Sequence, residues 1–264
     1  MISAPINSAA DAPGCAAVPG HIALDGPLNF RDLGGIVSRD GRMIRTGVLY
    51  RADDLGPLSA ADMVVLAQLG LQTVIDLRTP WELGRSSLAY REAGITHHHV
   101  PIIQELWSAE MVSAEDPALD LAMRYVQMVE HGASALAKVV SMAANRQHGP
   151  TVFHCAAGKD RTGVAAALIE RVLGVDDEVI ISRYAASGPV MVGLSQRWAR
   201  IAESDRDGGG PVHNAPAHFR DAPPAALRSF LQIIDDRFGG VEELLFAAGL
   251  VGADLEVLRH RMLA

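Results

Sequence analysis

The sequence predicts an α/β fold, with a central, mostly parallel sheet of four or five strands that is flanked by helices. Short apolar runs rich in β-branched residues recur along the chain, and longer segments with helical spacing of their apolar residues separate them. This alternation is typical of parallel sheets, because each parallel connection needs a crossover. With 264 residues and 49% hydrophobic content, the chain is long enough to bury a large core.

The N-terminal region, residues 1–24, is rich in Ala, Pro, Ser and Gly and has no periodicity, which predicts a flexible arm before a single domain over residues 25–264. It lacks a basic segment followed by an apolar core, and no stretch is long and apolar enough to span a membrane. We therefore expect a cytoplasmic protein without stable membrane insertion, although export without a signal peptide stays open. Cys15 is interpreted as a spare thiol in the arm.

The first half of the chain predicts its elements in order. Val48 to Arg51 is a short strand, and Ser59 is the N-cap of a helix that runs through Leu69. A buried strand at 72–77 and a short helix that begins at 79–82 follow. After a strand at 100–102, two helices are predicted at about 118–130 and 133–145, with Gly132 as the break between them.

The second half starts with a strand at 151–153 and a helix with apolar periodicity from Val164 onward. Asp176 and Asp177 open another helix, where acidic side chains suit the helix dipole. Further helices are predicted at about 188–206, 224–237, 241–248 and 253–263.

Between the strand and the helix of this second half lies one glycine-containing decapeptide. Such a turn into a helix N-terminus brings together backbone N–H groups without helical partners, which bind anions well. The segment therefore predicts a phosphate-binding loop, whose members are His154, Cys155, Ala156, Ala157, Gly158, Lys159, Asp160, Arg161, Thr162 and Gly163.

Cys155 and Arg161 stand six residues apart in this loop. The spacing predicts a sulfur below the phosphorus and a guanidinium beside two phosphate oxygens, which it can bind bidentately. A helix N-terminus also favours the thiolate, the nucleophilic form of cysteine. Thr162 could donate its hydroxyl to that sulfur. The pattern indicates covalent phosphoryl transfer through Cys155.

The segment His-Cys-x-x-Gly-Lys-Asp-Arg-Thr-Gly, together with the segments at 29–35 (Asn-Phe-Arg-Asp-Leu-Gly-Gly) and 74–78 (Val-Ile-Asp-Leu-Arg), resembles the atypical bacterial protein-tyrosine/phosphoinositide phosphatases. The resemblance spans residues 25 to 262, approximately, and implies the cysteine-dependent phosphatase fold with a helical cap or lid. It also implies a phosphomonoesterase that hydrolyses phosphotyrosine in proteins through a phosphocysteine intermediate. Phosphoinositides and phosphoserine or phosphothreonine are further candidate substrates, and the helix at 188–206 is either a lid or an ordinary packing helix.

The acid that protonates the leaving group has two candidates. Asp160 matches the position to which the resembled family assigns acid chemistry, and Asp76 falls at the carboxyl end of a predicted parallel strand, where ligand-binding residues collect. A salt bridge from Asp76 to Arg78 or Arg51 is the structural alternative. We favour Asp160 as the acid and Asp76 in a supporting role, and the residues alone leave the choice open.

Substrate choice depends on local charge, because the formal net charge of −8 gives the whole surface no attraction for nucleic acid. Lys159 adds a cation that we place at the rim of the loop, as in lipid-directed phosphatases of the superfamily, and this favours a site for a second phosphate. A surface lysine paired with Asp160 is the alternative. The expected partner is thus a phosphorylated protein or a phosphoinositide.

Two other functions fit the sequence less well. Three consecutive histidines, His97 to His99, invite a metal site, but adjacent residues on a strand point to opposite faces, so we expect no metal and no cofactor. A non-catalytic phosphate-binding pseudophosphatase would keep the loop and lose the nucleophile or the acid. Because Cys155, Asp160 and Arg161 are all present, the sequence favours an enzyme.

Overall fold

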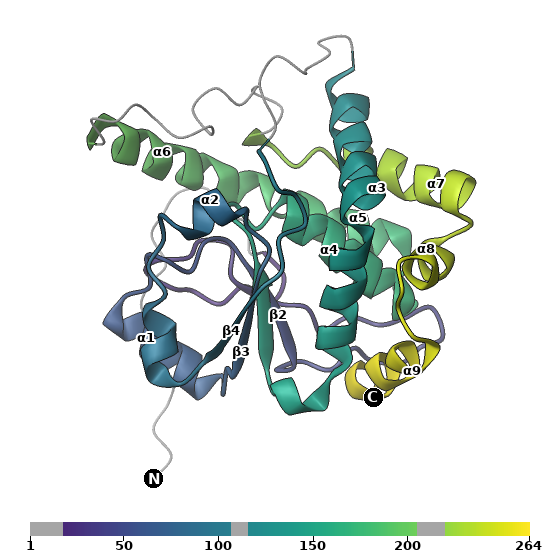
Figure 1. The fold of residues 1–264 in the computed structure, drawn as a ribbon, viewed down its shortest axis with the longest axis horizontal. Helices are drawn as coiled ribbons and strands as arrows, with labels where there is room; N and C mark the ends of the chain where they lie inside the picture. Colours follow the sequence, from purple (N-terminus) through teal and green to yellow (C-terminus); the bar gives the residue numbers. More distant parts are fainter. Residues whose placement is uncertain (1–17, 107–115, 205–219) are drawn as a thin grey trace.

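A computed structural model describes residues 18–106, 116–204 and 220–264 (Figure 1). Five strands form one sheet in the order β1-β2-β5-β3-β4. The four strands from β2 to β4 in that order are mutually parallel, and β1 pairs with β2 in the antiparallel direction. The strands are β1 (Arg31–Asp32), β2 (Leu49–Ala52), β3 (Thr73–Asp76), β4 (Thr96–His99) and β5 (Thr151–His154). The prediction of a mostly parallel sheet flanked by helices is confirmed.

Helices cover both faces of this sheet (Figure 1). Within the described residues, none is long and apolar enough to cross a membrane. The α-helices are α1 (Ala60–Gln68), α2 (Pro80–Leu83), α3 (Pro117–Ala144), α4 (Asp160–Val172), α5 (Asp177–Ala185), α6 (Gly188–Ser204), α7 (Pro224–Phe238), α8 (Val241–Ala247) and α9 (Gly252–Met262).

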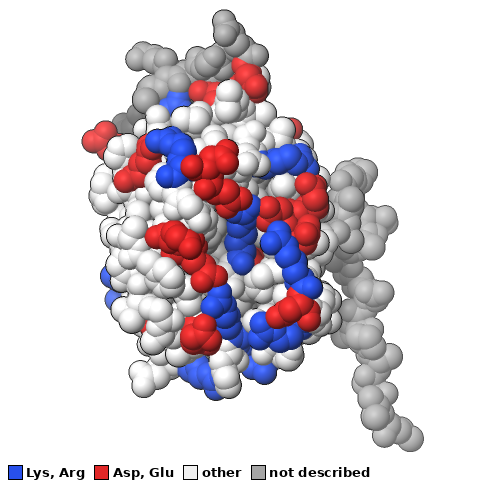
Figure 2. Space-filling model, turned by 90° about the vertical axis from the view of Figure 1, so that its right-hand side faces the viewer, with Lys and Arg blue, Asp and Glu red and all other residues white. Residues whose placement is uncertain are grey.

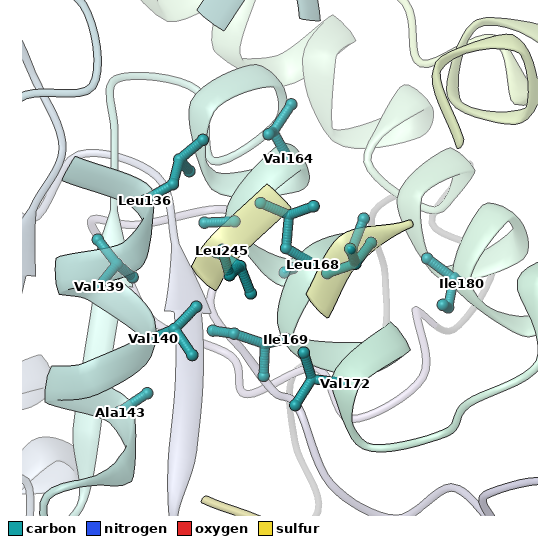
Figure 3. Packing of buried hydrophobic residues seen from close by; sticks show 14 of the residues in the cluster. Leu136, Val139, Val140, Ala143, Val164, Leu168, Ile169, Val172, Ile180 and Leu245 are labelled. Atoms are coloured by element: carbon teal, nitrogen blue, oxygen red, sulfur yellow. The ribbon is translucent and has the colours of Figure 1, made fainter. Parts of the chain in front are cut away.

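The alternation of side chains along the central strands builds a core on each face of the sheet. Val74 and Val152 are buried on one face, in a cluster that includes Leu66 of α1. Their neighbours Ile75 and Phe153 are buried in the larger cluster, which the helices α3, α4, α5, α7, α8 and α9 share. Figure 3 shows how side chains of α3 meet those of α4, α5 and α8 in this larger core. Because helices cover both faces of the sheet, the side chains on both sides of each central strand are buried, and this explains the continuous apolar runs in the sequence.

Helix α3 corrects one prediction from the sequence. It runs unbroken from Pro117 to Ala144, so the predicted pair of helices separated at Gly132 was wrong. A Cβ atom at Gly132 would lie 2.4 Å from the carbonyl oxygen of Ile102. The glycine therefore serves a close approach between the helix and the segment after β4, and does not end the helix.

Two segment boundaries also differ from the prediction. The strand expected at 100–102 was wrong, because β4 ends at His99, two residues before Pro101, which has no N–H to donate to a ladder. At the N-terminal end, residues 18–24 pack onto the fold: Val18 is buried and Ile22 donates its N–H to Phe30 O at 3.0 Å. Residues 1–17, with Cys15, lie outside the described residues.

The face that carries α7, α8 and α9 is charged but balanced. Figure 2 shows arginines and acidic residues interleaved across it. Arg171 lies between Asp177 and Asp235, at 2.6 and 2.5 Å, and Arg259 lies between Glu242 and Glu256. Because neither sign dominates, this face provides no field that would steer an anionic partner.

The strand register places the site. His154 at the end of β5 is aligned with Ala52 of β2 on one side and with Asp76 of β3 on the other. The carboxyl ends of these three adjacent parallel strands therefore meet at one edge of the sheet, where ligand sites of such sheets form. The predicted phosphate-binding loop starts at this edge and leads into α4.

Candidate active site

The loop from Cys155 to Lys159 connects β5 to the first turn of α4. Cys155 is a free thiol with 1% of its surface exposed. Gly158 has a φ of +65°, and a Cβ atom there would lie 2.6 Å from Ala52 O. Only glycine fits this position without strain, because it combines the left-handed backbone with contact to a neighbouring strand.

Three carbonyl groups of the loop are held by donors from other segments. Ala156 O accepts from the backbone N–H of Asp54 at 3.2 Å, Ala157 O from Asn29 Nδ2 at 3.0 Å, and Gly158 O from Arg51 Nη2 at 2.7 Å. In a planar trans peptide the N–H points away from the C=O. The three N–H groups that follow these carbonyls therefore point away from the donors, an orientation that suits the binding of an anion on the opposite side.

The segment at 29–35 supplies the support beneath the loop, a role that the sequence did not reveal. Asn29 donates to the loop, while its own Oδ1 accepts from Arg31 Nη1. The Asp53 carboxylate accepts from the N–H groups of Leu28 at 3.0 Å and Asn29 at 2.9 Å. Burial raises the pKa of Asp53 to about 6, although these two N–H groups oppose the shift.

Arg161 is held by Glu82, which sequence reasoning did not single out. The guanidinium donates from Nη1 to Oε2 at 2.5 Å and from Nη2 to Oε1 at 2.8 Å. Oε2 also accepts from Thr79 N, in the capping box that starts α2. Burial alone would raise the pKa of Glu82, but Arg161 outweighs it and lowers that pKa. The pair fixes the orientation of Arg161 and uses two of its five N–H donors.

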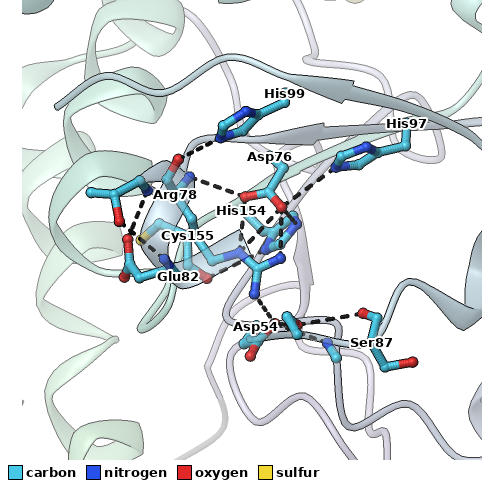
Figure 4. Close-up of polar contacts among 12 residues, drawn as sticks. Asp54, Asp76, Arg78, Glu82, Ser87, His97, His99, His154 and Cys155 are labelled. Carbon is cyan, nitrogen blue, oxygen red and sulfur yellow. Dashed lines mark hydrogen bonds and ion pairs between the residues drawn. The ribbon is translucent and has the colours of Figure 1, made fainter. Parts of the chain in front are cut away.

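Asp76 lies in a buried ion pair (Figure 4). Its Oδ2 lies 2.6 Å from Arg78 Nη2, 3.5 Å from His97 Nε2 and 3.7 Å from His154 Nε2. Burial alone would raise the pKa of Asp76, but His154, His97 and Arg78 together lower it well below its ordinary range. A carboxylate held in its ionised form suits a structural role beneath the loop and does not suit proton donation.

Asp160 occupies a different environment, in the first turn of α4. Its side chain is 21% exposed, and its Oδ1 lies 2.7 Å from the Tyr125 hydroxyl and 3.1 Å from Lys159 Nζ. Its neighbour in sequence, Arg161, is the arginine of the loop. Of the two candidates, Asp160 is the carboxyl group that solvent can reach, because the Asp76 side chain is fully buried.

Lys159 is not at the rim of the loop, where the sequence placed it. Its side chain is fully buried, donates to Asp221 O at 2.7 Å and pairs with Asp160 at 3.1 Å. The expected pairing with Asp160 is thus present, but in the interior and not at the surface. A buried lysine does not offer the cation for a second phosphate that the sequence suggested.

Ala157, Thr162 and Gly163 of the loop are also buried. Thr162 Oγ1 has no hydrogen-bond partner among the described residues, so the bond to sulfur that the sequence suggested is not formed in this structure. Gly163 lies against the ring of Tyr184, where a Cβ atom would come within 3.1 Å of Cδ2. Ala157 packs in a small apolar cluster with Val18 and three residues of α6, namely Val190, Met191 and Leu194.

The three consecutive histidines make separate contacts. His97 lies beside Asp76, His99 Nε2 contacts Arg78 O at 2.8 Å, and the His98 ring meets the His148 ring edge-on at 5.1 Å. Within the described ranges, no group of three or more side chains of the metal-binding types comes together. The histidines therefore support neighbouring groups individually.

Comparison with known proteins agrees with this geometry. The sequence pattern of the tyrosine phosphatase family matches residues 22–264. A Cupriavidus necator protein named "Putative tyrosine-protein phosphatase" is 32% identical over 265 residues, which cover 96% of this chain and 93% of that protein. A "Tyrosine-protein phosphatase" from Nostoc commune is 29% identical over 226 residues, or 83% of this chain and 75% of that one.

A third relative is the "Triple specificity protein phosphatase PtpB" of Mycobacterium tuberculosis, which is 27% identical over 276 residues, covering 91% of this chain and 98% of that protein. The family match includes every residue of the loop and every hydrogen-bond partner of the loop described above. This chain therefore belongs to the tyrosine phosphatase family, whose members are cysteine-dependent phosphatases.

Proposed function

We propose that the chain hydrolyses phosphotyrosine in proteins through a phosphocysteine intermediate. The observation that carries the proposal is the prepared loop: Cys155 stands at its start, three carbonyls are held back by Asp54, Asn29 and Arg51, and Arg161 is fixed by Glu82. The backbone of the loop and the Arg161 guanidinium are therefore held by contacts within the protein in an orientation that suits anion binding. Preorganised donors of this kind are an effective source of transition-state stabilisation.

In the first step, the Cys155 thiolate attacks phosphorus in line with the departing oxygen. The S–P bond forms as the P–O bond breaks, and Asp160 gives its proton to the leaving phenolate. The loop N–H groups and Arg161 stabilise the charge on the three equatorial oxygens. Asp76 supports the step indirectly, because it holds Arg78 and lies beside His154 under the loop.

In the second step, water attacks the phosphocysteine. Asp160, now ionised, accepts a proton from this water, the S–P bond breaks, and inorganic phosphate leaves with the thiolate restored. These two steps need no redox partner and no metal. The need for a reduced Cys155 supports a cytoplasmic location, where thiols are kept reduced.

Phosphoinositides and phosphoserine are secondary candidate substrates. The name of the Mycobacterium tuberculosis relative favours a broad specificity. The burial of Lys159 counts against a second phosphate subsite built on that side chain. Phosphotyrosine is therefore the substrate that we place first.

The test is phosphate release in EDTA from a phosphotyrosine peptide, a phosphoserine peptide and a monophosphorylated phosphoinositide, measured side by side. The Cys155→Ser variant is the blank. We expect metal-independent release that is fastest from the phosphotyrosine peptide and absent in the blank. Release that persists in Cys155→Ser would refute the mechanism, and a faster rate on the phosphoinositide would reverse the substrate order.

A further inference from the structure

Two buried tyrosines connect Asp160 to the interior of the protein. Tyr125 of α3 places its hydroxyl 2.7 Å from Asp160 Oδ1 and 2.6 Å from the hydroxyl of Tyr184 in α5. The two rings meet edge-on, with centroids 6.1 Å apart and an interplanar angle of 81°. Neither residue belongs to the loop, and the steps of the proposed function do not use them.

The direction of these hydrogen bonds follows from the chemistry of the groups. Burial raises the pKa of both tyrosines well above the ordinary value, so both hydroxyls keep their protons at neutral pH. An ionised carboxylate only accepts hydrogen bonds, and each hydroxyl has one proton to donate. Tyr125 therefore donates to Asp160, and Tyr184 donates to Tyr125.

The two oxygens of Asp160 consequently differ. Oδ1 accepts from Tyr125 and lies 3.1 Å from the Lys159 ammonium, whereas no donor among the described residues reaches Oδ2. A proton on Oδ1 would face two donors and displace at least one of them. A proton on Oδ2 leaves both contacts of Oδ1 intact.

We infer that Tyr125, held by Tyr184, is a positioning residue for Asp160 that keeps Oδ1 occupied and so places the transferable proton on Oδ2. This inference rests on the proposed function, in which Asp160 is the acid. The tyrosines touch neither substrate nor phosphorus and act only through the carboxyl group. Asp160 supplies the proton, and the tyrosine pair decides which oxygen carries it.

Both tyrosine rings are fixed by packing against neighbouring residues. The Tyr125 ring meets the ring of Phe230 edge-on at 5.9 Å, and Tyr184 packs against α4 at Gly163. A side chain at position 163 would press on the Tyr184 ring, because even a Cβ atom would come within 3.1 Å of it. The last glycine of the decapeptide thus leaves room for the tyrosine that orients Tyr125.

The test compares two aryl phosphates in the variants Tyr125→Phe, Tyr184→Phe and Asp160→Asn. Dinitrophenyl phosphate has a leaving group that departs as the anion without an acid, and phenyl phosphate has one that needs a proton. The measured quantity is kcat/KM, which reports the step in which the leaving group departs. Its ratio between the two substrates, taken on one preparation, does not depend on the fraction of folded enzyme.

For Tyr125→Phe, we expect kcat/KM to fall about tenfold on phenyl phosphate and by less than about twofold on dinitrophenyl phosphate. Tyr184→Phe should show the same selectivity at about threefold, because it weakens the hydrogen bond without removing it. Tyr90→Phe is the matched control: Tyr90 is also buried, but its hydroxyl has no hydrogen-bond partner among the described residues, so both rates should stay unchanged.

Equal losses on the two substrates in Tyr125→Phe would show a merely structural role and overturn the inference, as would unchanged rates on both. The Asp160→Asn variant distinguishes a failure of the role inferred for Tyr125 from a failure of the assignment of Asp160 as the acid. If Asp160→Asn is selective against phenyl phosphate and Tyr125→Phe is not, the inference alone fails. If Asp160→Asn is itself unselective, the assignment of the acid in the proposed function fails, and the inference fails with it.

Discussion

Replacing Glu82 with glutamine tests the arrangement that holds Arg161. The substitution keeps the shape of the side chain but removes its charge, and it sets an amide NH2 against one of the two guanidinium nitrogens that now lie at 2.5 and 2.8 Å from the carboxylate. Both side chains of the pair are 8% exposed, so water cannot replace the lost contact. We expect the variant to lose stability and activity together.

The magnitude follows from the burial of the pair. Breaking a buried ion pair by removing one partner costs about 3 to 5 kcal/mol. Glutamine can still accept from Thr79 N and from one guanidinium nitrogen, so we expect the lower end, about 3 kcal/mol. In a chain of this length that lowers Tm by about 6 to 12 °C. A misoriented Arg161 should also lower kcat/KM by about 100-fold.

The assay is thermal and urea unfolding of both proteins, with Glu178→Gln as the control. Glu178 forms a similar pair with Arg228 at 2.7 Å, but its side chain is 70% exposed, so its loss should cost less than about 1 kcal/mol. The pKa of Glu82 is lowered in the folded state. The stability that it contributes is therefore complete above its ordinary pKa and is lost as the pH falls, so the wild type and Glu82→Gln should converge below about pH 4.

The reasoning would be refuted if Glu82→Gln unfolded at the same temperature as Glu178→Gln at neutral pH. A stability gap of the same size at neutral and acid pH would also contradict it, because the gap would then not come from the charge of Glu82.

Three further predictions concern the support of the loop. Gly158→Ala forces a Cβ atom to within 2.6 Å of Ala52 O at a positive φ, so kcat/KM on a phosphotyrosine peptide should fall at least about 100-fold; retention of half the activity would contradict the argument. Asn29→Ala leaves the buried Ala157 O without its 3.0 Å donor, and we expect about a tenfold loss of kcat/KM and about 1 to 3 kcal/mol of stability, measured by urea unfolding. For Asp53, the folded-state pKa of about 6 lies above the ordinary value, so the stability that this group contributes is complete below about pH 4 and is lost as the pH rises through 6. Relative to Asp53→Asn, this loss should be on the order of 3 kcal/mol between pH 4 and 7, and parallel stability profiles for the two proteins would exclude it.

Local patterns predicted the parts of the molecule that lie close together in sequence. The decapeptide from His154 to Gly163 contains the proposed nucleophile, the arginine, the glycines and the helix N-terminus, so the position of the loop between a strand and a helix could be predicted without a structure. Asp76 could be placed at the edge of the sheet because the strand before it is short and apolar. In both cases the residues that support the prediction lie within one short segment of the sequence.

Contacts between segments that are far apart in the chain could not be predicted from local sequence patterns. Glu82 and Arg161 are 79 residues apart, and Asn29 and Ala157 are 128 apart. The acidic residue in the first turn of α2 looked like an ordinary helix start, and it is one, since Glu82 also completes the capping box there. Its second role depends on how the chain after β3 folds over the loop.

Tertiary packing also explains why two expectations from local sequence were wrong: that a glycine ends a helix, and that a lysine lies at the surface. Gly132 breaks no helix, because α3 is held along its length by α7 and α9 and the glycine makes room for Ile102. Lys159 is buried although it is charged, since Asp221 O and Asp160 satisfy it inside the protein. In each case the tertiary partner lies too far away in sequence to be predicted from a short window.

The central claim is that phosphoryl transfer passes through the sulfur of Cys155. The most direct measurement is to mix enzyme with a phosphotyrosine peptide, quench the reaction with acid within milliseconds, and map the phosphorylated residue by mass spectrometry, with Cys155→Ser in parallel. We predict one added phosphoryl group on Cys155 in the wild type, which disappears as the substrate is consumed, and none in the variant. Turnover without phosphorylated Cys155, or a phosphoryl group on His154, would contradict the mechanism.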